Sequence, residues 1–174
     1  MSLRNHAPLV LIVLMLTSAG GGATSHAQET PAAEWRAFGG TWSAVGRRQT
    51  LPTEGARAAA IVQLSGAVVL STAAGLSRAF HAEALGFDDG NGLAAGRAVW
   101  TDTRGDLVFS VLKGETLATG RRIAATITGG TGRYAGIAGD WTLTWQFVVE
   151  TEDGEVQGRA SDLKGRFRGI ETRP

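Results

Sequence analysis

Residues 140–150 alternate between apolar and polar side chains, and this pattern constrains the fold more than any other in the chain. The odd positions are apolar and the even positions mostly polar, so that Trp141, Leu143, Trp145, Phe147 and Val149 alternate with Thr142, Thr144, Gln146, Val148 and Glu150. Successive side chains of a β-strand point to opposite faces of the sheet. The segment is therefore predicted to be a strand with one buried face.

Further segments of this kind follow one another along the chain, separated by turn residues. We predict strands over residues 35–49, 58–71, 76–87, 93–102, 107–113, 121–128, 140–150 and 156–167. The segments between them contain Gly, Asp and Asn, as in DDGNG at 88–92, and these residues favour tight turns. About eight or nine strands joined by short turns predict an all-β, antiparallel up-and-down barrel or a sandwich. We favour the barrel because closing the sheet removes exposed edges in a chain that has no cysteine.

The N-terminal residues have the pattern of a secretory signal peptide. Arg4 and His6 precede an apolar run over 9–16, and small residues then lead to Ala27. The run is well short of the ~20 residues that cross a bilayer, which argues against the alternative of a transmembrane anchor. We expect cleavage after Ala27, a secreted or periplasmic protein with no membrane span, a flexible lead-in over 28–34 and one barrel domain over 35–174.

Charge and composition exclude several classes of function. The chain has 17 Lys+Arg and 16 Asp+Glu, so that loss of Arg4 with the signal peptide leaves 16 of each. A neutral domain lacks the basic surface that nucleic acids require, so we expect no nucleic-acid partner. His81 is the only histidine after Ala27 and there is no cysteine, so we expect no metal site and no cofactor.

A glycine-rich stretch, GGTGRYAGIAG, occupies residues 129–139 between two predicted strands. Its glycine spacing does not match a nucleotide-binding loop, and a strand pattern follows it where such a loop needs a helix. Glycines permit positive φ and close backbone approach, so we predict a tight turn or a bulge here. Tyr134 and Ile137 would then pack as plugs against the end of the barrel.

This stretch, together with GRAVWTDTRGD at 96–106, resembles the allene oxide cyclase-like barrel proteins. The dirigent proteins share that barrel and a related GGTG element. The resemblance implies a secreted, bacterial-type member with a calycin-like, eight-stranded antiparallel barrel and an apolar lumen. In characterised relatives the lumen steers cyclisation or coupling of a reactive apolar intermediate, so cyclase or isomerase activity is implied by the resemblance alone. No catalytic residue is carried over from these relatives.

His81 and Glu83 form the one acid–base pair of the mature chain. Residues i and i+2 of a strand share a face, and Leu85 and Phe87 continue that face. If this face lines the lumen, the pair would be a candidate general acid and base, because apolar surroundings raise the pKa of a carboxyl group. If the face points outward, the pair is an ordinary polar surface, and the apolar residues on the opposite face favour this alternative.

Trp141, Trp145 and Phe147 form an aromatic stripe on one face of the predicted strand over 140–150, and this stripe is part of the candidate ligand-binding surface. Large rings on one face of a strand are more often core than pocket, but in a small barrel the lumen is the core. The candidate ligand-binding residues are Trp100, Tyr134, Trp141, Trp145 and Phe147.

Two hypotheses of function follow from the sequence. The first is a barrel that binds a small apolar molecule in its lumen, with cyclase-type activity implied by the resemblance alone. An enzyme that works by proton transfer from Glu83, with His81 beside it, is a separate form of this hypothesis. The alternative is a non-catalytic structural or interaction barrel whose lumen is filled by its own side chains. A hydrolase is not expected, because G-x-S-x-G is absent and one histidine remains after processing.

Overall fold

The computed structural model describes residues 34–55, 57–73, 75, 77–91, 94–117 and 120–169. The predicted signal peptide lies outside the described residues, as does all of the predicted lead-in except Glu34. Within the described ranges, no helix has the length and apolar character that would let it cross a membrane.

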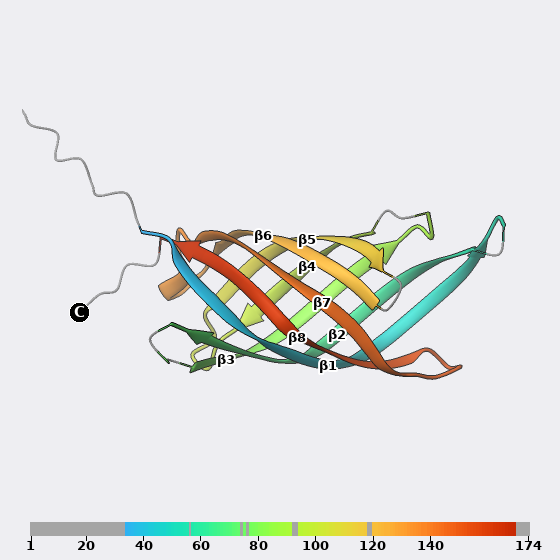
Figure 1. The fold of residues 1–174 in the computed structure, drawn as a ribbon, viewed down its shortest axis with the longest axis horizontal. Coiled ribbons are helices and arrows are strands. Elements are labelled where there is room, and N and C mark those ends of the chain that lie inside the picture. Colours follow the sequence, from blue (N-terminus) through green and yellow to red (C-terminus); the bar gives the residue numbers. More distant parts are fainter. Residues whose placement is uncertain are drawn as a thin grey trace, which may run out of the picture. The chain divides into compact units, whose positions relative to one another are not determined.

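Within these residues, eight strands form a closed antiparallel barrel (Figure 1). They are β1 (Arg36–Thr53), β2 (Arg57–Thr72), β3 (Ser77–Asp88), β4 (Ala94–Thr101), β5 (Leu107–Leu117), β6 (Gly120–Gly130), β7 (Ala138–Glu150) and β8 (Glu155–Arg168), with a 3₁₀ turn, η1 (Gly132–Tyr134), between β6 and β7. Each strand pairs with its neighbours in the chain, and β1 pairs with β8 to close the barrel. The predicted all-β, up-and-down barrel is confirmed.

Two strands, β1 and β5, continue through segments that the sequence predicted to be loops. Leu51 and Pro52 continue β1 by pairing with Ala59 and Ala58, although the sequence predicted a loop there. Likewise β5 continues to Leu117, which lies opposite Gly120, through residues predicted to be a loop. In both hairpins the partner strand supplies pairing that outweighs the local turn preference.

The side chains that face the interior can be followed from strand to strand. The buried positions have even numbers from β1 to β5 and odd numbers on β6 and most of β7. The change occurs because the β5–β6 hairpin pairs even-numbered with odd-numbered residues, as in Leu112 with Ala125 and Ser110 with Ile127. A bulge at Thr128 ends this register, and beyond it Val108 pairs with Gly130. Val149, predicted to lie on the buried face, is exposed, because the β7–β8 register shifts between Phe147 and Val149.

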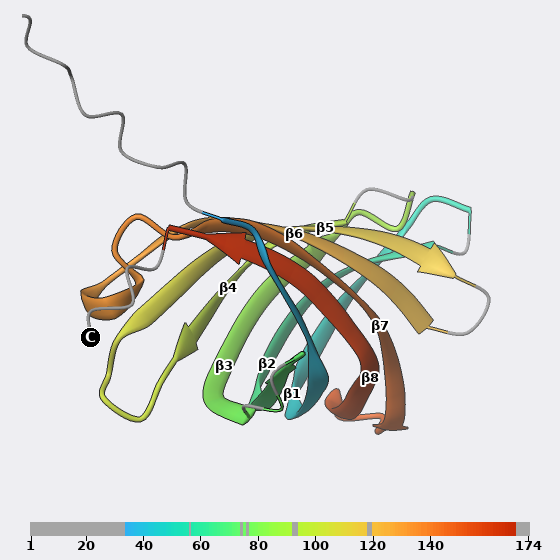
Figure 2. The ribbon, with the colours of Figure 1, turned by 60° about the vertical axis from the view of Figure 1, so that its left-hand side comes forward.

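The barrel has two dissimilar ends, which we call the filled end and the open end. Figure 2 shows the end of the barrel where β1 begins and β8 finishes, which is the filled end. Aromatic rings pack across the interior there. Trp100 stacks on Trp141 with ring centroids 5.1 Å apart, and Phe80 lies 5.8 Å from both Trp100 and Tyr134. The Trp141 indole Nε1 donates a hydrogen bond to Ser110 Oγ at 3.2 Å. Such packing is typical of a dense protein core.

Candidate functional site

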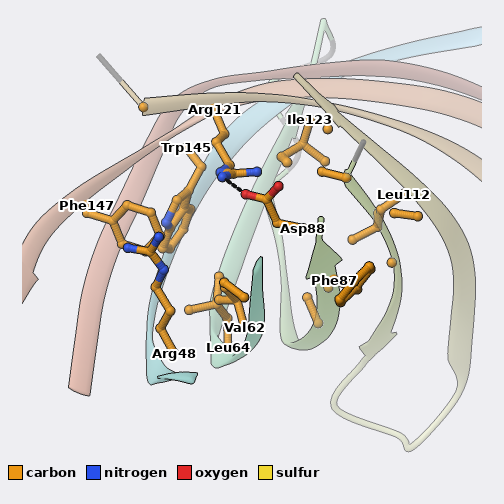
Figure 3. Close-up of a pocket in the computed structure, with 18 of the residues that line it drawn as sticks. Arg48, Val62, Leu64, Phe87, Asp88, Leu112, Arg121, Ile123, Trp145 and Phe147 are labelled. Atoms are coloured by element: carbon orange, nitrogen blue, oxygen red, sulfur yellow. Dashed lines mark hydrogen bonds and ion pairs between the residues drawn. The ribbon is translucent and has the colours of Figure 1, made fainter. Parts of the chain in front are cut away.

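A pocket of about 280 Å³ occupies the open end of the barrel, where β1, β3, β5 and β7 finish (Figure 3). Its volume is near the lower limit for sites that hold small organic ligands. Most of the lining is apolar, and three charged side chains join it. The lining includes Trp42, Ala60, Val62, Leu64, Ala84, Gly86, Gly96, Leu112, Gly114, Ile123, Trp145 and Phe147, with Arg48, Asp88 and Arg121.

Small residues at interior positions explain why this end is hollow. Gly86 lies opposite Gly96 in the β3–β4 ladder, and Ala94 lies opposite Gly114 in the β4–β5 ladder. These positions contribute at most a methyl group to the interior. At the filled end, in contrast, Phe80 of β3 and Trp100 of β4 carry large rings into the interior. The alternation of small and large interior residues along the strands thus divides the lumen into a packed half and a pocket.

Aromatic side chains form one wall of the pocket. The Trp42 and Trp145 ring centroids are 4.9 Å apart, and Phe147 stands nearly perpendicular to Trp145 at 6.1 Å. Trp145 packs directly on Gly158 of β8, where a Cβ atom would collide with the indole ring. The buried Nε1 atoms of Trp42 and Trp145 have no hydrogen-bond partner within the described ranges. This wall is therefore held by ring packing, without the hydrogen bond that anchors Trp141.

Two ion pairs lie at the mouth of the pocket. Asp88 at the end of β3 pairs with Arg121 at the start of β6, and Arg48 of β1 pairs with Glu150 of β7. In Figure 3 the Arg121 and Asp88 side chains point toward one another over the apolar lining. Asp88 Oδ1 also accepts a hydrogen bond from the Gly90 N–H at 2.9 Å, which fixes the carboxylate. Each arginine is paired with a carboxylate, so these two pairs make the mouth polar without adding net charge.

The glycine-rich stretch closes the opposite, filled end. Tyr134 and Ile137 are buried there, which confirms the predicted plugs. Gly132 has φ of 50°, and a Cβ atom at this position would collide with the Asp106 carboxylate. Glycine is therefore required by both backbone conformation and contact.

The buried carboxylate of Asp102 connects the glycine-rich stretch to the turn between β4 and β5. Asp102 accepts hydrogen bonds from the Tyr134 hydroxyl at 3.1 Å and from the backbone N–H groups of Arg104 and Asp106. The Arg133 guanidinium lies 2.8 Å from the same carboxylate. Burial alone would raise the pKa of Asp102, but the hydrogen bonds and the Arg133 charge outweigh it and hold the pKa below its ordinary value.

Tyr134 is the only tyrosine of the chain, so its titration can be observed directly. Burial, and then the neighbouring Asp102 carboxylate, raise the pKa of its hydroxyl above the ordinary 10.0, against the opposing effect of Arg78. Because the folded-state pKa is raised, we expect the tyrosinate absorbance to appear above pH 10.0 in the folded protein and at lower pH in denaturant. Ultraviolet titration measures this, with Tyr134→Phe as the blank. A folded-state midpoint at or below that of the denatured protein would contradict the expected environment of Tyr134.

The predicted acid–base pair lies outside the barrel. His81 and Glu83 are exposed on the outer face of β3, and His81 Nε2 lies 3.3 Å from Ser65 Oγ. The alternative that placed this face in the lumen is wrong. Phe80, Ala82 and Ala84 face inward instead, and the small Ala82 lies opposite Trp100, where it leaves room for the indole. A catalytic role for the pair stays a prediction and would require a substrate at the outer surface.

The predicted ligand-binding residues all face inward but divide between the two ends. Trp145 and Phe147 line the pocket. Trp100, Tyr134 and Trp141 belong to the packed core of the filled end. Contact of any of them with a ligand stays a prediction.

Several pocket residues were not predicted from the sequence. Asp88 was assigned to a turn and Arg121 to the first position of a strand, yet both line the pocket. A signal for Arg121 was present, because it has the same parity as the apolar residues Ile123, Ala125 and Ile127 of its strand. Trp42 likewise shares the parity of Phe38, which is buried.

Comparisons with known proteins find a likeness in structure but none in sequence. No protein-family model and no curated protein sequence matches the chain. The solved structure of the pterocarpan synthase dirigent protein GePTS1 is similar, with a TM-score of 0.46 and 10% sequence identity, over 84% of this chain and 99% of that chain. The eight-stranded antiparallel barrel that the resemblance implied is confirmed by the strand pairing of this chain itself.

Proposed function

We propose that the protein binds a small, mainly apolar molecule in the pocket at the open end of the barrel. The observation that carries this proposal is the pocket itself, about 280 Å³ with mostly apolar lining, in a barrel whose other end is densely packed. Protein interiors are normally close-packed, and apolar pockets with a few convergent polar groups are the usual sites of small-molecule binding. Burial of an apolar ligand against Trp42, Trp145 and Phe147 supplies the main stabilisation.

The rival hypothesis is a structural or interaction barrel in which the lumen has no ligand. The filled end fits that hypothesis equally well, because small eight-stranded barrels can be packed throughout. The small residues at the open end favour binding. If the chain only needed a stable barrel, larger side chains at Ala60 and Ala84 would fill the space and add stability.

Filling the pocket is expected to abolish binding. N-phenyl-1-naphthylamine is an uncharged probe that fluoresces in apolar sites, and we expect saturable binding to one site per chain. Ala60→Leu and Ala84→Leu add volume inside the pocket and should weaken this binding at least about tenfold, since steric overlap removes apolar contact worth a few kcal/mol. Fluorescence titration measures the dissociation constants.

Ala67→Leu is the matched control, because Ala67 is exposed on the outer face of β2. It should bind the probe as the unmodified chain does. Lack of saturable binding by the unmodified chain would reject the proposal in favour of the structural barrel. Unchanged binding by both pocket variants would place the probe elsewhere and also reject it.

A further inference from the structure

We infer that the Asp88–Arg121 ion pair selects the ligand by charge, admitting uncharged molecules with a polar group at the mouth and excluding ions of either sign. This inference rests on the proposed function, because it assigns a ligand class to the same pocket. Its basis is the position, burial and charge balance of the pair.

The pair spans strands that are not neighbours in the sheet. Asp88 belongs to β3 and Arg121 to β6, with β4 and β5 between them. Both residues line the pocket, and the side chains of Asp88 and Arg121 are only 10% and 23% exposed. A ligand that enters the pocket therefore comes into contact with a charge pair that is largely removed from water.

The charge balance at the mouth disfavours ionic ligands. Arg121 is neutralised by Asp88, and Arg48 by Glu150. An anion or a cation that entered would lose its hydration without gaining an opposite charge of its own, and uncompensated burial of a charge is costly. An uncharged ligand avoids this penalty.

The same pair can bind an uncharged polar group. A guanidinium carries five N–H donors, and the contact with Asp88 engages the Nη2 end of Arg121. A carboxylate has several acceptor sites, of which the described contacts of Asp88 are those with Arg121 and the Gly90 N–H. The mouth thus offers donors and acceptors to a hydroxyl or carbonyl group, while the ring system of the ligand packs on Trp42, Trp145 and Phe147.

Four naphthalene compounds of similar shape test the selectivity at about pH 7. They are naphthalene, 2-naphthylmethanol, 2-naphthoate and 2-naphthylmethylammonium, each used to displace N-phenyl-1-naphthylamine. We expect the alcohol to bind about tenfold more tightly than either ion and at least as tightly as the hydrocarbon, because a hydrogen bond contributes modestly and an unpaired buried charge costs more. If either ion binds as tightly as the alcohol, the inference is wrong while the proposed function stands.

Removing one partner of the pair should reverse the selectivity. Asp88→Asn leaves the Arg121 charge unpaired, so binding of 2-naphthoate should tighten about tenfold. Arg121→Gln leaves the Asp88 charge, so binding of 2-naphthylmethylammonium should tighten by a similar factor. The two variants thus shift in opposite directions, which a general loosening of the barrel would not produce.

Asp140→Asn and Arg166→Gln are the matched controls. They make the same substitutions in an ion pair on the outer face, where the Arg166 and Asp140 side chains are 59% and 52% exposed. Their selectivity should equal that of the unmodified chain. Unchanged selectivity in both pocket variants would overturn the inference, whereas loss of probe binding by the unmodified chain would instead overturn the proposed function.

Discussion

Replacing Asp102 by alanine is expected to lower the free energy of unfolding by about 3–5 kcal/mol. The Asp102 side chain is 2% exposed and accepts hydrogen bonds from Tyr134, Arg104 and Asp106 beside the Arg133 charge. Removal of the carboxylate leaves these donors without their acceptor, and leaves Arg133 with Asp106 as its remaining carboxylate partner. Chemical denaturation of the two proteins at neutral pH measures the difference.

Asp140→Ala is the control for this prediction. Asp140 also pairs with an arginine, at 2.9 Å, but both side chains are largely exposed to water. Water and salt screen such pairs, so the cost should be about 0–1 kcal/mol. If Asp102→Ala and Asp140→Ala lowered the free energy of unfolding equally, the buried contacts of Asp102 would stabilise the fold no more than an exposed ion pair does.

Low pH should remove the contribution of the Asp102 carboxylate to the free energy of unfolding. The pKa of its carboxyl group is lowered in the folded state, so the ionised form stabilises the fold above the ordinary pKa of 3.8. This contribution is lost as the pH falls below 3.8 through the folded-state pKa. The stability difference between the unmodified chain and Asp102→Ala should therefore shrink in that range.

Removal of Trp141 is expected to cost more than removal of Trp145, although both are buried in the same strand. Trp141→Ala should lower the free energy of unfolding by about 4–5 kcal/mol, the upper range for deletion of a buried aromatic ring. Trp141 stacks on Trp100 and donates to Ser110, so its loss creates a void and leaves the buried Ser110 hydroxyl without this partner. Unfolding in denaturant, followed by circular dichroism, measures this cost.

Trp145→Ala should cost about 2 kcal/mol less. Trp145 already borders the pocket, so its deletion enlarges an existing space, and its Nε1 has no partner to lose among the described residues. The stability lost when a side chain is truncated depends on the volume of the new cavity and on the polar groups left without a hydrogen bond. Equal costs for the two variants would contradict the division of the lumen into a packed and a hollow half.

The barrel could be predicted from the sequence because its determinants are local. Alternation over residues 140–150 and the DDGNG turn identify strands and a hairpin without knowledge of any distant contact. Strand ends were less predictable. Pro52 lies within β1 because Ala58 on the partner strand is in position to pair with it, and that partner is not visible in the local pattern.

On β3, hydrophobicity only weakly favours the face that the structure buries. Leu85 and Phe87 are exposed, whereas Ala82 and Ala84 on the other face are buried. In a narrow barrel, interior positions opposite a tryptophan must be small, so alanine can be a stronger sign of the interior than leucine. The choice depends on Trp100 of the adjacent strand, which period-two alternation within β3 cannot reveal.

The pocket was the least predictable feature. The volume of the pocket is the space that the eight strands enclose minus the volume of the side chains that point into it. Each lining residue, taken singly, has a pattern that a filled core would also produce. The Asp88–Arg121 pair requires the spatial proximity of β3 and β6, which no interval in the sequence indicates.

Each strand contributes one of its halves to the filled end of the barrel and the other half to the open end, so the two ends can change independently in evolution. Because the strands alternate in direction, the open end is built around the hairpins β1–β2, β3–β4, β5–β6 and β7–β8. Asp102, Tyr134 and Trp141, which secure the fold, lie on the opposite connections or beside them. Under the proposed function, substitutions near the four open-end hairpins would alter ligand preference while the packed end remains intact, so that recognition and stability would evolve as separate traits within one continuous sheet.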